Sequence, residues 1–260
     1  MSPNDPPTEI SVRALLDAWE RAVPERPVAS ALALLAAGSE LDERALGALS
    51  LGERDRRLFA VRERLFGPRL SSVANCPRCE ETVELSCNVR DLLVEAPERA
   101  PDDTPLPRQL VTDGHEITFR LLTSADLLAV AERGWTATAA ESRSDEWRRL
   151  FDCCVLSATR SGEPVASSEL PAEVQLAVVS AMATADEQAD VEVNLVCPAC
   201  GCAWSSVFDI ASYLGGEMDA WARRLLADVH TLARRYGWSE AAILSMSARR
   251  RELYLELGDA

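Results

Sequence analysis

The sequence contains no lysine and only two histidines, so all 27 basic residues are arginines. An exclusive preference for arginine is typical of a GC-rich genome. The 42 acidic residues outnumber them and leave a net charge of −15. This charge opposes the neutralisation of phosphates on which non-specific binding to nucleic acid depends. We therefore expect a protein that does not bind nucleic acid.

Membrane-spanning and targeting segments are also lacking. No apolar run approaches the roughly 18–20 residues of a membrane-spanning helix, and the longest, at residues 28–37, is short and rich in alanine. The opening MSPNDPPTEI lacks the basic and apolar regions of a signal peptide. We therefore expect a cytoplasmic protein without membrane contact, in a compartment where disulfides do not persist.

Common catalytic signatures are missing as well: the sequence has no Walker A loop, GxGxxG, GxSxG or HExxH motif. His115 lies at an Asp-Gly turn, where we expect it to be exposed. His230 is expected to be a hydrogen-bonded polar residue in or beside the core. Cys153 and Cys154 are expected to be core thiols, with a redox pair as the alternative. We predict that the protein is not an enzyme.

What the sequence does have is one cysteine motif that occurs twice. Residues 76–79 read CPRC and residues 197–200 read CPAC, 121 residues later. A β-prone stretch and an (N/D)-(V/I)-x-x-x-L pattern follow each motif at the same offset. Two such turns supply the tetrahedral thiolate set of structural zinc, and four thiolates leave no open position for a substrate. The sequence therefore predicts a structural zinc ion bound by Cys76, Cys79, Cys197 and Cys200.

The alternatives to a zinc site are a redox dithiol and a disulfide. A redox dithiol or a disulfide also uses a CxxC pair, but neither motif adjoins a βαβ pattern. Cys202 offers a spare or alternative ligand, and Cys87 corresponds to Phe208 in the repeat, which indicates an apolar role. A zinc clamp would close a loop of 121 residues, which costs about 4 kcal/mol, whereas a zinc–thiolate site supplies about 10 kcal/mol or more.

Hydrophobic periodicity predicts an α+β fold that is predominantly α-helical, with the two CPxC β-knuckles paired into a zinc-ribbon-like site. We expect Gly52, Gly215 and Gly216 to interrupt helices. Helices are predicted near residues 11–23, 28–37, 42–49, 53–66, 123–131, 145–158, 167–182, 210–214 and 217–236, with two more capped by Ser239 and Ser247. Strands are predicted at residues 82–89, 110–112, 116–121, 191–196 and 204–208.

Two helices carry more specific expectations. The arginines of residues 53–66 are expected to form a solvated face with ion pairs such as Glu53–Arg57, with a partner surface as the alternative. In the helix that ends near Met182, the apolar residues, including Leu176 and Val179, are expected to be mostly buried.

Along the chain these elements divide into seven segments. They are a disordered tail (1–8), an N-terminal helical segment (9–70), the first knuckle (71–95), a proline-rich loop (96–108), a β-hairpin plus helical insertion (109–190), the second knuckle (191–216) and a C-terminal helical segment (217–260).

Beyond the CPxC knuckles, further short segments form a recognisable pattern, at residues 19–20, 52–55, 120–121, 123–127, 228–233, 236–240, 243–244, 249–250 and 254–255. This pattern resembles the baseplate hub assembly chaperone family of contractile-tail phages and phage-like contractile injection systems. The C-terminal part resembles it most specifically, and the CPxC knuckles are similar to those of its longer, zinc-ribbon-bearing members. Leu122 stands where the family pattern has a proline.

The resemblance implies a non-enzymatic assembly factor or minor component of the baseplate hub. Its expected partners are hub, spike or tape-measure-like proteins of a contractile particle. The alternatives are a zinc-ribbon nucleic-acid-binding or regulatory adaptor and, less favoured, a redox enzyme. Aromatic and arginine side chains are typical binding anchors, so the expected partner surface consists of Tyr236, Trp238, Arg249, Arg250 and Tyr254, with internal packing of the last helices as the alternative.

Overall fold

The computed structural model describes residues 10–22, 27–94, 106–132 and 140–258. The predicted disordered tail, and most of the predicted proline-rich loop, lie outside these residues. The chain divides into two compact units, one containing Leu41–Ile210 and the other Asp5–Glu40 with Ala211–Ala260. Helices joined to small antiparallel sheets confirm the predicted α+β class. Within the described ranges, no helix is long and apolar enough to cross a membrane.

The first unit contains all the strands that the structure describes. Its helices are α3 (Glu43–Gly47), α4 (Leu51–Phe66), α5 (Val89–Leu92), α6 (Ser124–Glu132), α7 (Ala140–Cys154) and α8 (Ala172–Ala185), with 3₁₀ turns η1 (Ser167–Glu169) and η2 (Glu187–Ala189). Its strands are β1 (Arg69–Asn75), β2 (Thr82–Asn88), β3 (Arg108–Thr112), β4 (His115–Phe119), β5 (Val155–Arg160), β6 (Glu163–Pro164), β7 (Glu192–Val196) and β8 (Ala203–Val207).

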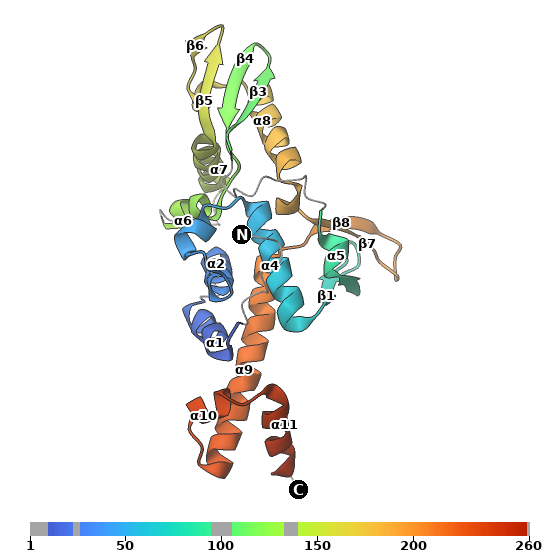
Figure 1. The fold of residues 1–260 in the computed structure, drawn as a ribbon. Helices are drawn as coiled ribbons and strands as arrows, with labels where there is room; N and C mark the ends of the chain where they lie inside the picture. Colours follow the sequence, from blue (N-terminus) through green and yellow to red (C-terminus); the bar gives the residue numbers. More distant parts are fainter. Residues whose placement is uncertain (1–9, 23–26, 95–105, 133–139, 259–260) are drawn as a thin grey trace. The chain divides into compact units, whose positions relative to one another are not determined.

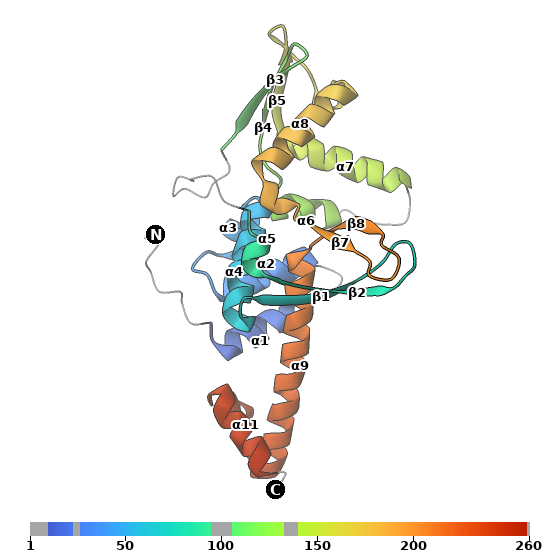
Figure 2. The ribbon, with the colours of Figure 1, turned by 90° about the vertical axis from the view of Figure 1, so that its right-hand side faces the viewer.

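A four-stranded sheet forms the centre of the predicted insertion, in the order β3-β4-β5-β6. Asp113 and Gly114 adopt positive φ angles of 44° and 70°, which confirms the predicted hairpin turn. Helix α8 lies beside this sheet in both views (Figures 1 and 2). The core between them includes Ile117, Phe119 and Val178, each at most 2% exposed.

The predicted helix at residues 145–158 is wrong at its C-terminal end. Helix α7 ends at Cys154, and residues from Val155 onward form β5, which pairs antiparallel with β4. The amide of Arg120 donates to the carbonyl of Cys154 at 2.9 Å, where the pairing begins. Pairing with β4 and the β-branched residues Val155 and Thr159 favour a strand. The tertiary context therefore overrides the helical spacing that continues from α7.

Helix α4 differs from the prediction in two ways. It begins at Leu51, so Gly52 lies inside it rather than before it. The predicted ion pair of Arg57 with Glu53 is present at 2.8 Å, but the face is not fully solvated, because Arg54 and Arg62 are 7% and 3% exposed. Arg54 is paired with a neighbouring carboxylate, and Arg62 donates to a backbone carbonyl. Local partners make burial of these charges tolerable.

Helix α8 is less buried than predicted. Val174 and Val178 are buried, but Leu176 is 67% and Val179 is 37% exposed. Helix α8 has only one strip of its surface against the sheet, so an apolar residue off that strip remains accessible.

The second unit is helical. Helix α1 (Val12–Arg21) packs against α2 (Pro27–Ala37), and Ser11 caps α1, accepting from the amide of Ala14 at 3.1 Å. Leu16, Ala222 and Leu225 form a buried cluster in which Trp19 also packs. The remaining helices are α9 (Ile210–Tyr236), most of which belongs to this unit, α10 (Glu240–Leu244) and α11 (Ala248–Leu257).

Helix α9 is continuous, so the predicted interruption at Gly215 and Gly216 is wrong. A glycine inside a helix costs only about 0.5–1 kcal/mol, and the same helix buries Leu214, Met218 and Leu225. Burying one such side chain contributes about 1.5–3 kcal/mol, which outweighs the penalty of both glycines. Ser239 and Ser247 cap α10 and α11 as predicted.

Candidate metal centre

Two β-hairpins present the CPxC motifs, and they share one turn geometry. In the first, between β1 and β2, the amide of Cys76 donates to Glu81 and the amide of Glu80 donates to Cys76, both at 2.9 Å. In the second, between β7 and β8, the amides of Cys197 and Gly201 make the equivalent bonds at 2.8 and 2.9 Å.

The shared turn requires a left-handed residue directly after the second cysteine. Gly201 has a φ of 68°, and Glu80 adopts a φ of 60° at the equivalent position. Glycine adopts this conformation without strain, whereas glutamate does so at a small cost. The two turns therefore have the same backbone conformation at positions 121 residues apart. The cysteine spacing alone does not reveal this similarity.

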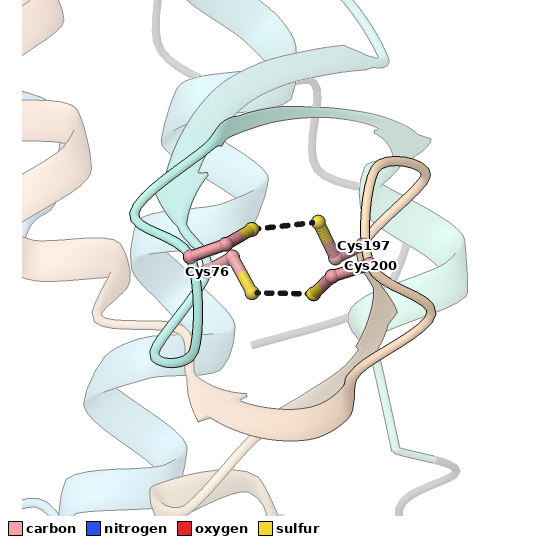
Figure 3. A group of neighbouring side chains, drawn as sticks. Cys76, Cys197 and Cys200 are labelled. Atoms are coloured by element: carbon pink, nitrogen blue, oxygen red, sulfur yellow. Dashed lines mark hydrogen bonds between the residues drawn. The ribbon is translucent and has the colours of Figure 1, made fainter.

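The four predicted ligands come together. The Sγ atoms of Cys76, Cys79, Cys197 and Cys200 all lie within 4.8 Å of one another. Figure 3 shows the thiols of Cys197 and Cys200 on one hairpin facing those of the other, with sulfur–sulfur distances of 3.6 Å from Cys76 to Cys200 and from Cys79 to Cys197. Zinc–sulfur bonds of about 2.3 Å in a tetrahedron place sulfurs about 3.8 Å apart. The donor set and its spacing are therefore positioned to hold a metal ion.

Electrostatics favour a cation at this point. The pKa of Cys76 is lowered to about 6: burial raises it, but the amides of Arg78 and Cys79 and the adjacent thiols lower it by more. The pKa of Cys200 is raised to about 12, because burial and the neighbouring thiols outweigh the amide of Cys202, which lowers it. Cys76 thus ionises readily, whereas Cys200 resists ionisation. A dication would remove that resistance and displace the remaining protons.

Only a small core supports the cluster besides the thiols. Cys76 and Cys197 are each 1% exposed, and Val83 is 9% exposed beside them. Trp204 and Cys202 pack against this group without being fully buried. The Figure 2 view shows the two hairpins side by side. The thiols of Cys76 and Cys197 therefore form part of the buried core at the point where the two hairpins meet.

Neither spare cysteine belongs to the cluster. Cys202 directs its thiol to the carbonyl of Ala203 at 3.8 Å, and the metal-compatible group among the described residues does not include it. Cys87 lies at the far end of β2, paired with Leu70, and burial raises its pKa.

The two histidines and the vicinal cysteines lie in different environments from one another. His115 is 2% exposed, so its predicted exposure is wrong; it begins β4 on the face that also carries the buried Ile117, and its Nδ1 lies 2.9 Å from the carbonyl of Asp113. His230 is exposed on α9, and not in the core. Of the vicinal thiols, Cys154 is buried as expected but Cys153 is exposed, because adjacent helical residues point about 100° apart.

The residues of the expected partner surface lie near one another in the second unit. The rings of Tyr236 and Trp238 stack at 4.5 Å, and Tyr254 meets Trp238 edge-on at 4.8 Å. Arg250 lies over the ring of Tyr254 at 5.7 Å, and Arg249 is exposed. The aromatic rings are engaged in packing α9 against α11, while both arginines remain exposed.

Sequence reasoning missed the strand β1 and the polar residues of η2. Gln188 is 3% exposed; its amide donates to the carbonyl of Leu92, and its Oε1 accepts from the amide of Val94. Asp186 accepts from the hydroxyl of Ser50 and the amide of Gly52. Their partners are more than 90 residues away in sequence, so no local pattern signals either role.

A protein-family model described as T4 bacteriophage base plate protein matches residues 34–215. The matched stretch is more than half of the chain and includes both cysteine pairs; it ends within α9, before α10 and α11. Searches of the curated proteins and of the solved structures gave no match.

Proposed function

Because the chain belongs to the T4 bacteriophage base plate protein family, we propose that it is an assembly chaperone, or a minor component, of the baseplate hub of a phage-like contractile tail or injection system. The observation that carries the proposal is the family match over residues 34–215. The resemblance of the C-terminal residues, which lie beyond that match, adds support for the hub in particular.

A structural zinc ion is part of the proposal. Cys76, Cys79, Cys197 and Cys200 would hold it, and its work is to join the two hairpins at the cluster that buries Cys76, Cys197 and Val83. A four-thiolate shell leaves no coordination position for a substrate. This supports a role in holding the fold rather than in catalysis.

The proposed partners are hub, spike or tape-measure-like proteins. We assign their contact to the C-terminal helices, where Arg249 and Arg250 are exposed beside the packed rings of Tyr236, Trp238 and Tyr254. Packing within the aromatic group fixes the orientation of α11, and the arginines on it remain accessible. Arginine next to aromatic side chains is a frequent combination at the centre of protein interfaces.

A tagged pull-down from cells that express the native gene cluster tests the function, with mass spectrometry of the eluate and of purified particles. Hub proteins in the eluate and no bait in the particle would establish a transient chaperone, whereas bait in both would establish a component. Nucleic acid or unrelated enzymes in their place would refute the proposal.

A charge-reversal pair tests the surface. Arg249→Glu together with Arg250→Glu should lower recovery of the hub proteins, while Arg224→Glu, at an exposed position of α9, should not. Equal recovery from both would show that the partner contacts a different part of the chain.

A further inference from the structure

The first unit contains an apolar groove that the proposed metal and hub surface do not use. It has a volume of about 270 Å³ and is walled by α7 through Trp147 and Phe151, by α8 through Val179 and Met182, and by Leu121 on the segment after β4. Residues of η2 close one end. Trp147 and Phe151 stack at 5.3 Å, so the α7 wall is a continuous aromatic surface.

The walls of the groove are not fully buried. Trp147 is 42% and Val179 is 37% exposed, although both are large and apolar. Each faces the groove from a different helix, α7 and α8 respectively. Large apolar side chains exposed next to one another mark an interaction site more often than an unfinished core. Covering them would contribute roughly in proportion to the apolar area removed from water.

Size and charge restrict what can fill the groove. Its volume lies below the roughly 300–1,000 Å³ of small-molecule sites, which favours a few side chains of a docked segment over a cofactor. The charged residues that line it, Asp186 and Asp190, are both acids, and no arginine is among the described lining residues. The carboxylate of Asp186 is already engaged by the N-terminus of α4. Asp190 is exposed and is therefore the charge available to a ligand.

We infer that this groove docks a short apolar segment of another baseplate protein, with an arginine or lysine of that segment next to Asp190. The inference rests on the proposed function for the identity of the partner. Apolar side chains would cover Trp147 and Val179, and the basic residue would compensate the acidic end. Complementary charge at the edge of an apolar site sets orientation and raises the rate of association.

Site-specific photocrosslinking in the full chain, expressed with its native gene cluster, tests the inference. A benzoylphenylalanine replaces Val179 in the groove or, as the matched control, Leu176, which is 67% exposed on the same helix and does not line the groove. We expect position 179, and not 176, to crosslink to a baseplate protein, through an apolar peptide that contains arginine or lysine.

Reversing the charge of Asp190 provides a second test, because this substitution leaves the apolar walls of the groove unchanged. Asp190→Arg in the crosslinking background should lower the yield about fivefold, while Glu173→Arg, at an exposed position near the start of α8, should leave it unchanged. Circular dichroism of each variant checks that the fold is kept.

Contrary outcomes separate this inference from the proposed function. Three outcomes would overturn the inference about the groove: no crosslink from position 179, a crosslink to a second copy of this chain, or a crosslinked segment that is acidic. The proposed function would still stand in each case if the unmodified chain recovers hub proteins. Failure of the unmodified chain to recover any baseplate protein would overturn the proposed function, and the inference with it.

Discussion

Replacing Cys197 by serine is expected to release the metal and to loosen the first unit. The thiol of Cys197 is 1% exposed and faces Cys79 at 3.6 Å, so it lies at the centre of the cluster. Serine has a similar size, but its hydroxyl is a poor ligand for zinc compared with a thiolate. The substitution therefore removes the metal bond with little change in packing.

The magnitude follows from what holds the hairpins at the thiols. Val83 is a buried aliphatic side chain packed with Cys76 and Cys197, and its burial contributes about 1.5–3 kcal/mol. Holding together segments 118 residues apart costs about 4 kcal/mol in loop closure. A zinc–thiolate site supplies about 10 kcal/mol or more, so loss of the clamp should lower the free energy of unfolding by about 6 kcal/mol or more, after the loop-closure cost is subtracted. At roughly 2–4 °C per kcal/mol, Tm should fall by more than about 10 °C.

Elemental analysis of the purified protein and calorimetry measure the two effects. The unmodified chain should contain about one equivalent of zinc, and Cys197→Ser should lose most of it. Cys153→Ser removes an exposed thiol outside the cluster and should keep both zinc content and Tm. Cys202→Ser tests the neighbouring thiol and should also keep the zinc. Full zinc content in Cys197→Ser, or an unchanged Tm after zinc loss, would refute the ligand set or the clamp.

Three further predictions concern the first unit and one control position. Gly52→Ala should lower the free energy of unfolding by about 1–3 kcal/mol, because its Cβ would overlap the carboxylate of Asp186. As a control, Gly215→Ala, in open space within α9, should raise the free energy of unfolding by about 0.5–1 kcal/mol. Equal effects of the two substitutions in urea denaturation would contradict the contact between Gly52 and Asp186. Asp126→Ala should cost about 2–3 kcal/mol in thermal unfolding, because it removes a bidentate ion pair with Arg120 and the hydrogen bonds that the carboxylate accepts from Thr123, the residue before α6. A loss below about 0.5 kcal/mol would match an exposed pair instead. Desolvation by burial raises the pKa of Asp55 to about 6 from 3.8, so its contribution to stability falls as pH rises between these values; a carboxyl ¹³C titration with a midpoint below about 4.5 would contradict this.

The parts of the fold that the sequence predicts are those with local signals. The two knuckles are encoded by a repeated spacing, and the caps Ser11, Ser239 and Ser247 by a residue type at a helix start. The turn at Asp113 and Gly114 is equally local. The cysteine cluster was predictable because each half is defined within four residues.

Other features depend on contacts between distant segments. Strand β1 has few β-prone residues, and its pairing with β2 makes it a strand. His115 follows a turn, but alternation along β4 places it on the face of Ile117, toward the core. The groove between α7 and α8 depends on how the two helices meet the sheet, which no periodicity within either helix determines.

The cysteine hairpins and the groove are both connected to one short element, η2. Strand β7 of the second knuckle follows η2 directly, and α5, which follows the first knuckle, is bonded to it through Gln188. The same turn carries Asp186 at its start, against the N-terminus of α4, and leads to Asp190 at the acidic end of the groove. Both hairpins therefore constrain the position of η2. The second hairpin does so because β7 follows η2 in the chain, and the first does so through the hydrogen bonds of Gln188. Closing the hairpins on a metal would fix both constraints at once, and with them the acidic end of the groove.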